Sequence, residues 1–233
     1  MKLWRLIEQL ETPYAEAWLR SPARHVKPAA CDYCGRGAEY EDPRPLVIEW
    51  EAGSDVVGDF VWPGGGRVAA QRRVFDIMTA NLRGIEPGSV EMVQDPKLKR
   101  PTRKTRRTRP RVWLPYEGPE LVELWVQRSV HTAPGTAIEP KKPCPKCGHE
   151  AWTWSGVEVK QHIWDKEQMK LVPLFIPRDP ERGLRIRASD VEGASIFRTI
   201  EFPNGILCTD AVRELIERER FTNVDFLDYG DLV

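Results

Sequence analysis

Two cysteine motifs constrain this chain more than any other feature of its sequence. Each is Cys-x-x-Cys followed by glycine, and they occupy residues 31–35 and 144–148. Two thiolates reach one tetrahedral ion only through a tight turn, and glycine tolerates the positive φ that such a turn requires. Two turns supply four ligands and leave no open position for water, which is typical of a structural site. The sequence therefore predicts one metal site formed by Cys31, Cys34, Cys144 and Cys147.

Structural zinc is the expected ion at this site, and an iron centre held by the same kind of turns is the alternative. A single pair would also suit a redox dithiol, but two pairs with the trailing glycine favour a shared ion. His25 and His149 lie near the motifs in sequence. With four thiolates present, we expect both to face solvent. Cys208 stands alone in an apolar segment and is expected to be buried and inert.

The spacing of the motifs suggests how the chain is organised. Residues 35–143, 109 in all, separate the two pairs, so the ion would close the base of a large insertion. We predict an N-terminal helix and first zinc knuckle at 1–34, an inserted α+β lobe at 35–143, and the second knuckle with a C-terminal α+β lobe at 144–233. Closing so long a loop is entropically unfavourable, so metal removal is expected to loosen the whole chain.

Hydrophobic periodicity predicts an α+β fold with mixed sheets and a zinc-ribbon-like clip of four cysteines. Leu3, Leu6, Ile7 and Leu10 have helical spacing. Further helices are expected at about 68–82 and from Thr209 onward, where Thr209 would cap the helix. Strands are expected at 46–50, 59–62, 89–93, 121–126, 206–208 and 224–227, with a hairpin at 151–164. Two strand–helix–strand units, at 60–93 and 206–227, follow, and they echo each other weakly.

The composition gives few hints of function. Apolar residues make up 41% of the chain, and the formal net charge is zero. These totals show no sign of a nucleic-acid or membrane protein. Charge interrupts the N-terminus too early for a signal peptide, and no apolar run is long enough to span a membrane. We therefore expect a soluble protein of the cytoplasm, without a membrane partner.

No familiar catalytic motif occurs in the sequence. The nucleophile elbow, the His-Glu-x-x-His zinc motif and the phosphate-binding loop are all missing, and none of the four histidines has a recognisable acid–base setting. We therefore expect a protein that is not an enzyme. An enzyme with an unrecognised site remains an alternative.

Charge is concentrated in two segments. Residues 97–111 hold nine Lys or Arg and no acid, which suits either a solvated loop or a phosphate-binding patch. The solvated loop is the preferred interpretation, because the run has no aromatic residue on which bases could stack. The last 24 residues hold seven acids and three arginines. This segment suits either a solvated helix face or a docking face for a basic partner.

The paired cysteines and the C-terminal block resemble the double-CXXCG motif family. The block reads Glu-Phe-Pro-Asn-Gly-Ile-Leu-Cys-Thr at 201–209 and Phe-Thr-Asn-Val-Asp-Phe at 221–226. The resemblance runs nearly the full length, and its specific parts are the cysteine pairs and this block. Members form a large paralogous set in social, swarming bacteria. They are described as immunity proteins of swarm-inhibition toxin systems, encoded beside a polymorphic toxin.

The resemblance implies a cytosolic immunity protein, or antitoxin, that binds and blocks the toxin encoded by a neighbouring gene. Only the four cysteines carry over as defined positions, and the toxin-binding residues are unknown. The alternative is a zinc-ribbon nucleic-acid-binding protein that uses the basic run 97–111. It predicts an affinity for DNA or RNA that falls steeply with salt.

Overall fold

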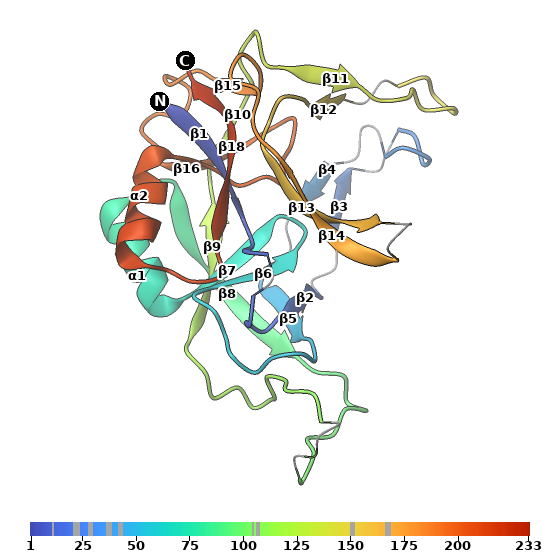
Figure 1. The fold of residues 1–233 in the computed structure, drawn as a ribbon, viewed down its shortest axis with the longest axis vertical. Helices are drawn as coiled ribbons and strands as arrows, with labels where there is room; N and C mark the ends of the chain where they lie inside the picture. The colour runs from blue at the N-terminus through green and yellow to red at the C-terminus, as the bar shows by residue number, and fades with distance from the viewer. Residues whose placement is uncertain are drawn as a thin grey trace.

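The structure is a computed structural model. It describes residues 1–10, 12–20, 24–27, 30–35, 39–41, 44–103, 105, 108–149, 152–165 and 169–233. These residues form mainly β-strands, with two α-helices (Figure 1). The sheets are mixed, as predicted. Within the described ranges, neither helix is long and apolar enough to cross a membrane.

The first large sheet, sheet A, contains residues from both ends of the chain. Its strands, in spatial order, are β10 (Ser129–Val130), β16 (Ile196–Thr199), β17 (Leu207–Thr209), β1 (Lys2–Ile7), β18 (Asp225–Leu232) and β15 (Leu184–Ile186). Helix α2 (Asp210–Glu219) connects β17 to β18. The two termini therefore lie close together at one edge of the molecule (Figure 1).

The second large sheet, sheet B, comes from residues 17–126. Its strands, in spatial order, are β2 (Ala17–Leu19), β5 (Leu46–Trp50), β8 (Ile85–Val93), β9 (Leu121–Val126), β7 (Arg67–Gln71) and β6 (Phe60–Gly64). Helix α1 (Arg72–Asn81) connects β7 to β8. The two helices lie on the same side of the molecule (Figure 1).

Three two-stranded hairpins complete the fold. They pair β3 (Arg24–Lys27) with β4 (Glu39–Glu41), β11 (Ile138–Pro140) with β12 (Trp152–Trp154), and β13 (Val159–Asp165) with β14 (Lys170–Ile176). All three lie on the side of the molecule opposite the helices (Figure 1).

Five strands and one helix of sheet A correspond to five strands and one helix of sheet B. The order β16-β17-β1-β18-β15 matches β6-β7-β9-β8-β5. Pairing directions match too: the outer pairs β15–β18 and β5–β8 are parallel, and the other pairs are antiparallel. The central strand differs in origin, because β9 follows β8 in the chain whereas β1 comes from the N-terminus.

The two corresponding units also contact each other reciprocally. The loop after α1 reaches the start of β16, where the Arg83 carbonyl accepts a hydrogen bond from the Ser195 amide at 2.9 Å. The loop after α2 reaches the start of β6, where the Phe60 amide donates to the Thr222 carbonyl at 3.3 Å. Asp59 reinforces this second contact by accepting the Thr222 amide at 2.9 Å. The units therefore pack in the manner of a two-fold pair.

The core consists of three clusters of buried side chains. The central cluster takes residues from both sheets and both helices, including Val74 and Met78 of α1 and Val212 and Ile216 of α2. A second cluster belongs to sheet A and a third to sheet B. Each large sheet therefore contributes buried side chains to the shared central cluster and to a second cluster of its own.

The prediction of an N-terminal helix is wrong, because residues 2–7 form β1 at the centre of sheet A. Leu3 points into the sheet A cluster, whereas Trp4 and Leu6 point into the central cluster. A strand buried on both faces has no amphipathic alternation, so Leu3, Leu6 and Ile7 fell at helical spacing by chance. Pairing with β17 and β18, about 200 residues away, overrides the local pattern.

Other predicted boundaries also shift. The helix expected at 68–82 begins only at Arg72, because 67–71 form a fully buried strand of sheet B. The expected hairpin at 151–164 is divided, with β12 pairing to β11 and β13 to β14. Thr209 precedes α2 as predicted, but its side chain makes no capping hydrogen bond. The Asp210 carboxylate instead accepts the Trp4 indole N–H at 2.8 Å, which ties α2 to β1.

Candidate metal centre

Each cysteine pair lies in the loop of a two-stranded hairpin. Residues 31–34 lie between β3 and β4, and residues 144–147 lie between β11 and β12. Figure 1 shows these two hairpins one above the other on the same side of the molecule. Their meeting brings together two loops that are 109 residues apart in the chain.

Both loops have the same backbone geometry. The Gly35 amide donates to the Cys31 carbonyl at 2.9 Å, and the Gly148 amide donates to the Cys144 carbonyl at 2.8 Å. The two glycines have φ values of 72° and 69°. A Cβ at either glycine would contact nothing within 4 Å, so the backbone conformation alone selects glycine.

The four sulfur atoms form one compact group. All lie within 4.8 Å of one another. The Sγ atoms of Cys31 and Cys144 are 4.0 Å apart, and those of Cys34 and Cys147 are 3.7 Å apart. Four thiolates at about 2.3 Å from one ion in tetrahedral geometry are separated by about 3.8 Å. The donor set and its spacing therefore fit a four-coordinate metal ion.

The surroundings favour the thiolate form that a metal ion requires. The backbone amide of Cys34 is the main cause that lowers the pKa of the Cys31 thiol, to about 7. Burial works to raise the pKa of the Cys144 thiol, but backbone amides, led by that of Cys147, lower it on balance. Cys31 and Cys144 are buried, whereas Cys34 and Cys147 are exposed. One side of the site therefore faces solvent.

A charged contact outside the metal site joins the two loops. The Lys146 ammonium pairs with the Asp32 carboxylate, and each lies between the two cysteines of its own motif. The opposite charges at these two x positions are visible in the sequence, but we did not predict the contact. Both side chains are exposed, so the pair aligns the loops and contributes little stability.

The other candidate ligands lie outside this group. Within the described ranges, the group of His, Cys, Asp and Glu residues close enough to hold an ion contains only the four cysteines. His149 is half-buried, and its carbonyl accepts the Cys144 amide at 2.9 Å. The side chain of His25 lies outside the described residues. Cys208 is fully buried in β17, as predicted, and burial raises the pKa of its thiol far above the ordinary value.

Three aspartates of the acidic C-terminal segment are paired with cations from outside it. Arg178 pairs with both Asp228 and Asp231, and Lys160 pairs with Asp225. These ion pairs neutralise three of the seven acids, and they do not support a docking face for a basic partner, which was one of the two interpretations of this segment.

The basic run behaves differently. Lys104, Arg106 and Arg107 lie outside the described residues. The other six cations form no ion pair with any described residue; they are Lys97, Lys99, Arg100, Arg103, Arg109 and Arg111. This run lies in the long connection between β8 and β9, which projects from the molecule at the bottom of Figure 1.

Two comparisons with known proteins found no match. No protein-family model matches the chain, and no curated protein matches it.

Proposed function

We propose that this protein is an immunity protein that binds and neutralises a cognate bacterial toxin in the cytosol, and that one structural zinc ion holds its two cysteine hairpins together. The observation that carries the proposal is the convergence of two distant Cys-x-x-Cys-Gly turns into one four-thiolate group. A closed group of four thiolates has no position for substrate or water, so it supports an architectural role for the ion.

Zinc suits the site better than other ions. Zinc accepts tetrahedral thiolate coordination without any redox demand, and structural zinc sites in ribbon folds use this ligand set. Two hairpins that each present a cysteine turn are the expected scaffold of a zinc ribbon. Together with the units β7–α1–β8 and β17–α2–β18, this clip is the architecture that we propose for the immunity function.

The immunity assignment rests on the resemblance of the cysteine pairs and the block 201–226 to the double-CXXCG motif family. A growth assay tests it. The chain is co-expressed in a test bacterium with the toxic domain encoded by the neighbouring gene. We expect growth to be restored and the two proteins to copurify. A folded, zinc-loaded chain that neither restores growth nor copurifies would overturn the assignment.

Nucleic-acid binding by the basic run is the second candidate. The six unpaired cations of residues 97–111 favour it, because unpaired Lys and Arg side chains are available to phosphates. This candidate predicts an affinity for random DNA or RNA that falls by orders of magnitude between low and high salt. The immunity function predicts tight binding of one protein and little binding of random nucleic acid. A salt series with a labelled oligonucleotide separates the two.

A further inference from the structure

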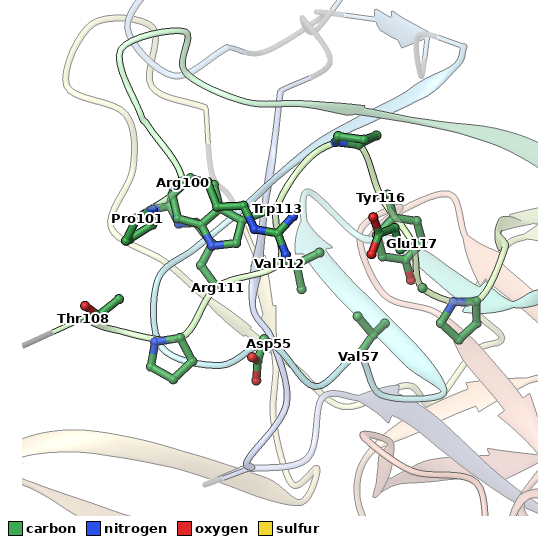
Figure 2. A pocket seen from close by; sticks show the side chains of 14 residues that line it. Asp55, Val57, Arg100, Pro101, Thr108, Arg111, Val112, Trp113, Tyr116 and Glu117 are labelled. Carbon is green, nitrogen blue, oxygen red and sulfur yellow. The ribbon is translucent and has the colours of Figure 1, made fainter. Parts of the chain in front are cut away.

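A pocket of about 300 Å³ lies where the basic connection between β8 and β9 folds back against the segment that precedes β6. Figure 2 shows Arg100, Arg111 and Trp113 gathered on one side of the pocket. Tyr116 and Glu117 lie on the other side. The pocket is distant in sequence from both cysteine loops and shares no residue with them.

The walls of this pocket are held in place by the fold. The backbone of Arg111 forms a β-bridge with Ala52, and the Gly53 amide donates to the Pro110 carbonyl at 2.8 Å. On the other side, the Tyr116 ring stacks on Trp50 with centroids 6.1 Å apart and planes 21° apart. The pocket is therefore preformed and does not depend on ligand to assemble.

Gly118 allows the chain to turn closely around the tyrosine. A Cβ at Gly118 would lie 2.4 Å from the Tyr116 hydroxyl oxygen, which no real side chain tolerates. The close approach covers the hydroxyl and keeps it from solvent.

Two of the residues that line this pocket each bury one polar atom without a hydrogen-bond partner among the described residues. These atoms are Nη1 of Arg111 and the hydroxyl oxygen of Tyr116. The guanidinium lies 5.9 Å from the centre of the Trp113 ring. Burial raises the pKa of the nearby Glu51 carboxyl, and the charge of Arg111 acts in the opposite direction. Burial raises the pKa of Tyr116 to about 12, so the phenol stays protonated and able to donate at neutral pH. Buried donors without acceptors are unfavourable, and native proteins rarely retain them without a reason.

The charges around the pocket select the kind of ligand. Arg100 and Arg111 belong to the run of unpaired cations, so the pocket attracts an anion. The exposed carboxylates of Asp55 and Glu117 also line it and need hydrogen-bond donors. A polypeptide offers a carboxylate side chain, backbone carbonyls and backbone N–H groups within a few ångströms. A phosphodiester backbone offers only the anion and leaves the two carboxylates without a hydrogen-bond donor.

We propose that this pocket receives an acidic side chain of a polypeptide partner, with the carboxylate accepting from the guanidinium groups of Arg100 and Arg111. This inference rests on the proposed function, since it assigns to the toxin an acidic segment that enters the pocket. The surrounding unpaired cations steer that segment toward it.

A peptide titration tests the proposal on the full-length, zinc-loaded chain. The probe is an acetylated, amidated peptide of eight glutamates, titrated at low salt and followed by isothermal calorimetry. Arg111→Gln should weaken binding about tenfold, because it removes a charge-assisted hydrogen bond. Arg109→Gln is the matched control, since Arg109 is an exposed cation of the same run that does not line the pocket. It should weaken binding less than about twofold.

Arg100→Gln separates the pocket from general charge attraction. It removes the same charge as Arg109→Gln, but from a cation that lines the pocket, and we expect weakening of about threefold to tenfold. Equal losses in the Arg111 and Arg109 variants would overturn the proposal in favour of diffuse attraction, as would the absence of any binding. Tighter binding of eight-nucleotide oligothymidylate, with the same dependence on Arg111, would overturn it in favour of nucleic acid.

The growth assay separates failure of this proposal from failure of the proposed function. Peptide binding that depends on Arg111, combined with no rescue from the toxin, would support the pocket proposal and contradict the immunity function. Full rescue by the Arg111→Gln chain would support the immunity function and show that the pocket is not part of the toxin interface.

Discussion

Sheets A and B solve the same packing problem with different chain connections. Both contain the order of five strands described above, and both contribute to the central cluster. In sheet B the central strand β9 is joined to its neighbour β8 by residues 94–120. In sheet A the central strand β1 comes from the opposite end of the chain. The difference teaches that the first residues of this chain are a structural part of its C-terminal half.

The largest expected effect comes from removing β1. Deleting residues 1–10 takes away the centre of sheet A, including Leu3, Trp4 and Leu6, which are all buried. The exposed edges of β17 and β18 would then have no partner, so we expect the truncated chain to lose its cooperative thermal transition. Circular dichroism during heating measures this. A truncated chain that melts like the parent would show that the two sheets do not depend equally on their central strands.

A circular permutant sharpens the same comparison. The Leu232 amide donates to the Met1 carbonyl at 2.9 Å, so the termini are adjacent. Moving residues 1–10 to follow Val233 through a short Gly-Ser linker gives sheet A the connection that sheet B already has. We expect the permutant to fold and to melt cooperatively, unlike the truncated chain. Failure of the permutant to fold would mean that the order of connection matters as well as the strand.

The next effect concerns an ion pair buried inside sheet B. Arg67 of β7 donates two hydrogen bonds to Glu123 of β9, and their side chains are only 2% and 3% exposed. Among the described residues, sheet A has no ion pair buried to this degree. Glu123→Ala strands the guanidinium and should lower the free energy of unfolding by about 3–5 kcal/mol.

Urea unfolding measures this loss, and Glu120→Ala is the matched control. Glu120 pairs with Arg72 on the surface, where the side chains are 62% and 42% exposed. The control should change the free energy of unfolding by less than about 1 kcal/mol. Equal effects of the two substitutions would contradict the account of the buried pair.

A smaller effect tests the correspondence of the two helices. Val74 is the third residue of α1 and Val212 the third residue of α2, and both have exposed fractions of 0% in the central cluster. Val→Ala at either position removes two methyl groups from a packed core. Each should lower the free energy of unfolding by about 2 kcal/mol, measured in urea. A difference of more than about 1 kcal/mol between them would break the correspondence.

The smallest effect lies at the edge of sheet A and depends on pH. The Arg178 guanidinium lowers the pKa of the Asp231 carboxyl, mainly through a hydrogen bond. A carboxyl whose pKa is lower in the folded state stabilises the fold above the pKa of the unfolded chain, near 4. That contribution is lost as the pH falls through the lower folded value.

Asp231→Asn should therefore reduce the stability by about 1 kcal/mol at pH 7, given that the carboxylate is partly exposed. The difference from the parent should shrink below pH 4. A difference that stays constant from pH 7 to pH 3 would show that the ionised carboxylate is not the cause.

The sequence predicted those parts of the fold that depend on local patterns. The strands at 46–50 and 121–126 were predicted with their observed bounds, because each is a short apolar run between polar or turn residues. The four cysteines were predicted as one group because the coordination chemistry requires it. Strand β1 was missed because its partners lie about 200 residues away and leave no trace in the local pattern.

The pocket could not be predicted from the sequence either. Arg111 appeared as one of nine similar cations, and Tyr116 as one aromatic residue in a proline-rich loop. Their shared feature is that each buries a polar atom without a partner among the described residues, which depends on how Ala52 and Trp50 pack against them. Burial of this kind is a property of tertiary structure.

The expected effect of metal removal changes in the light of the structure. None of the buried side chains in the three core clusters comes from the two cysteine loops. We therefore expect chelation to separate the two cysteine hairpins while sheets A and B stay folded. This replaces the expectation from the sequence that the whole chain loosens.

Metal analysis of the purified chain tests the central claim most directly. The protein is expressed without added metal, and its metal content is measured by inductively coupled plasma mass spectrometry beside a Cys34→Ser/Cys147→Ser variant. The account predicts about one zinc ion per chain in the parent and close to none in the variant. Iron in place of zinc, or a metal-free parent whose four cysteines form disulfides, would contradict it.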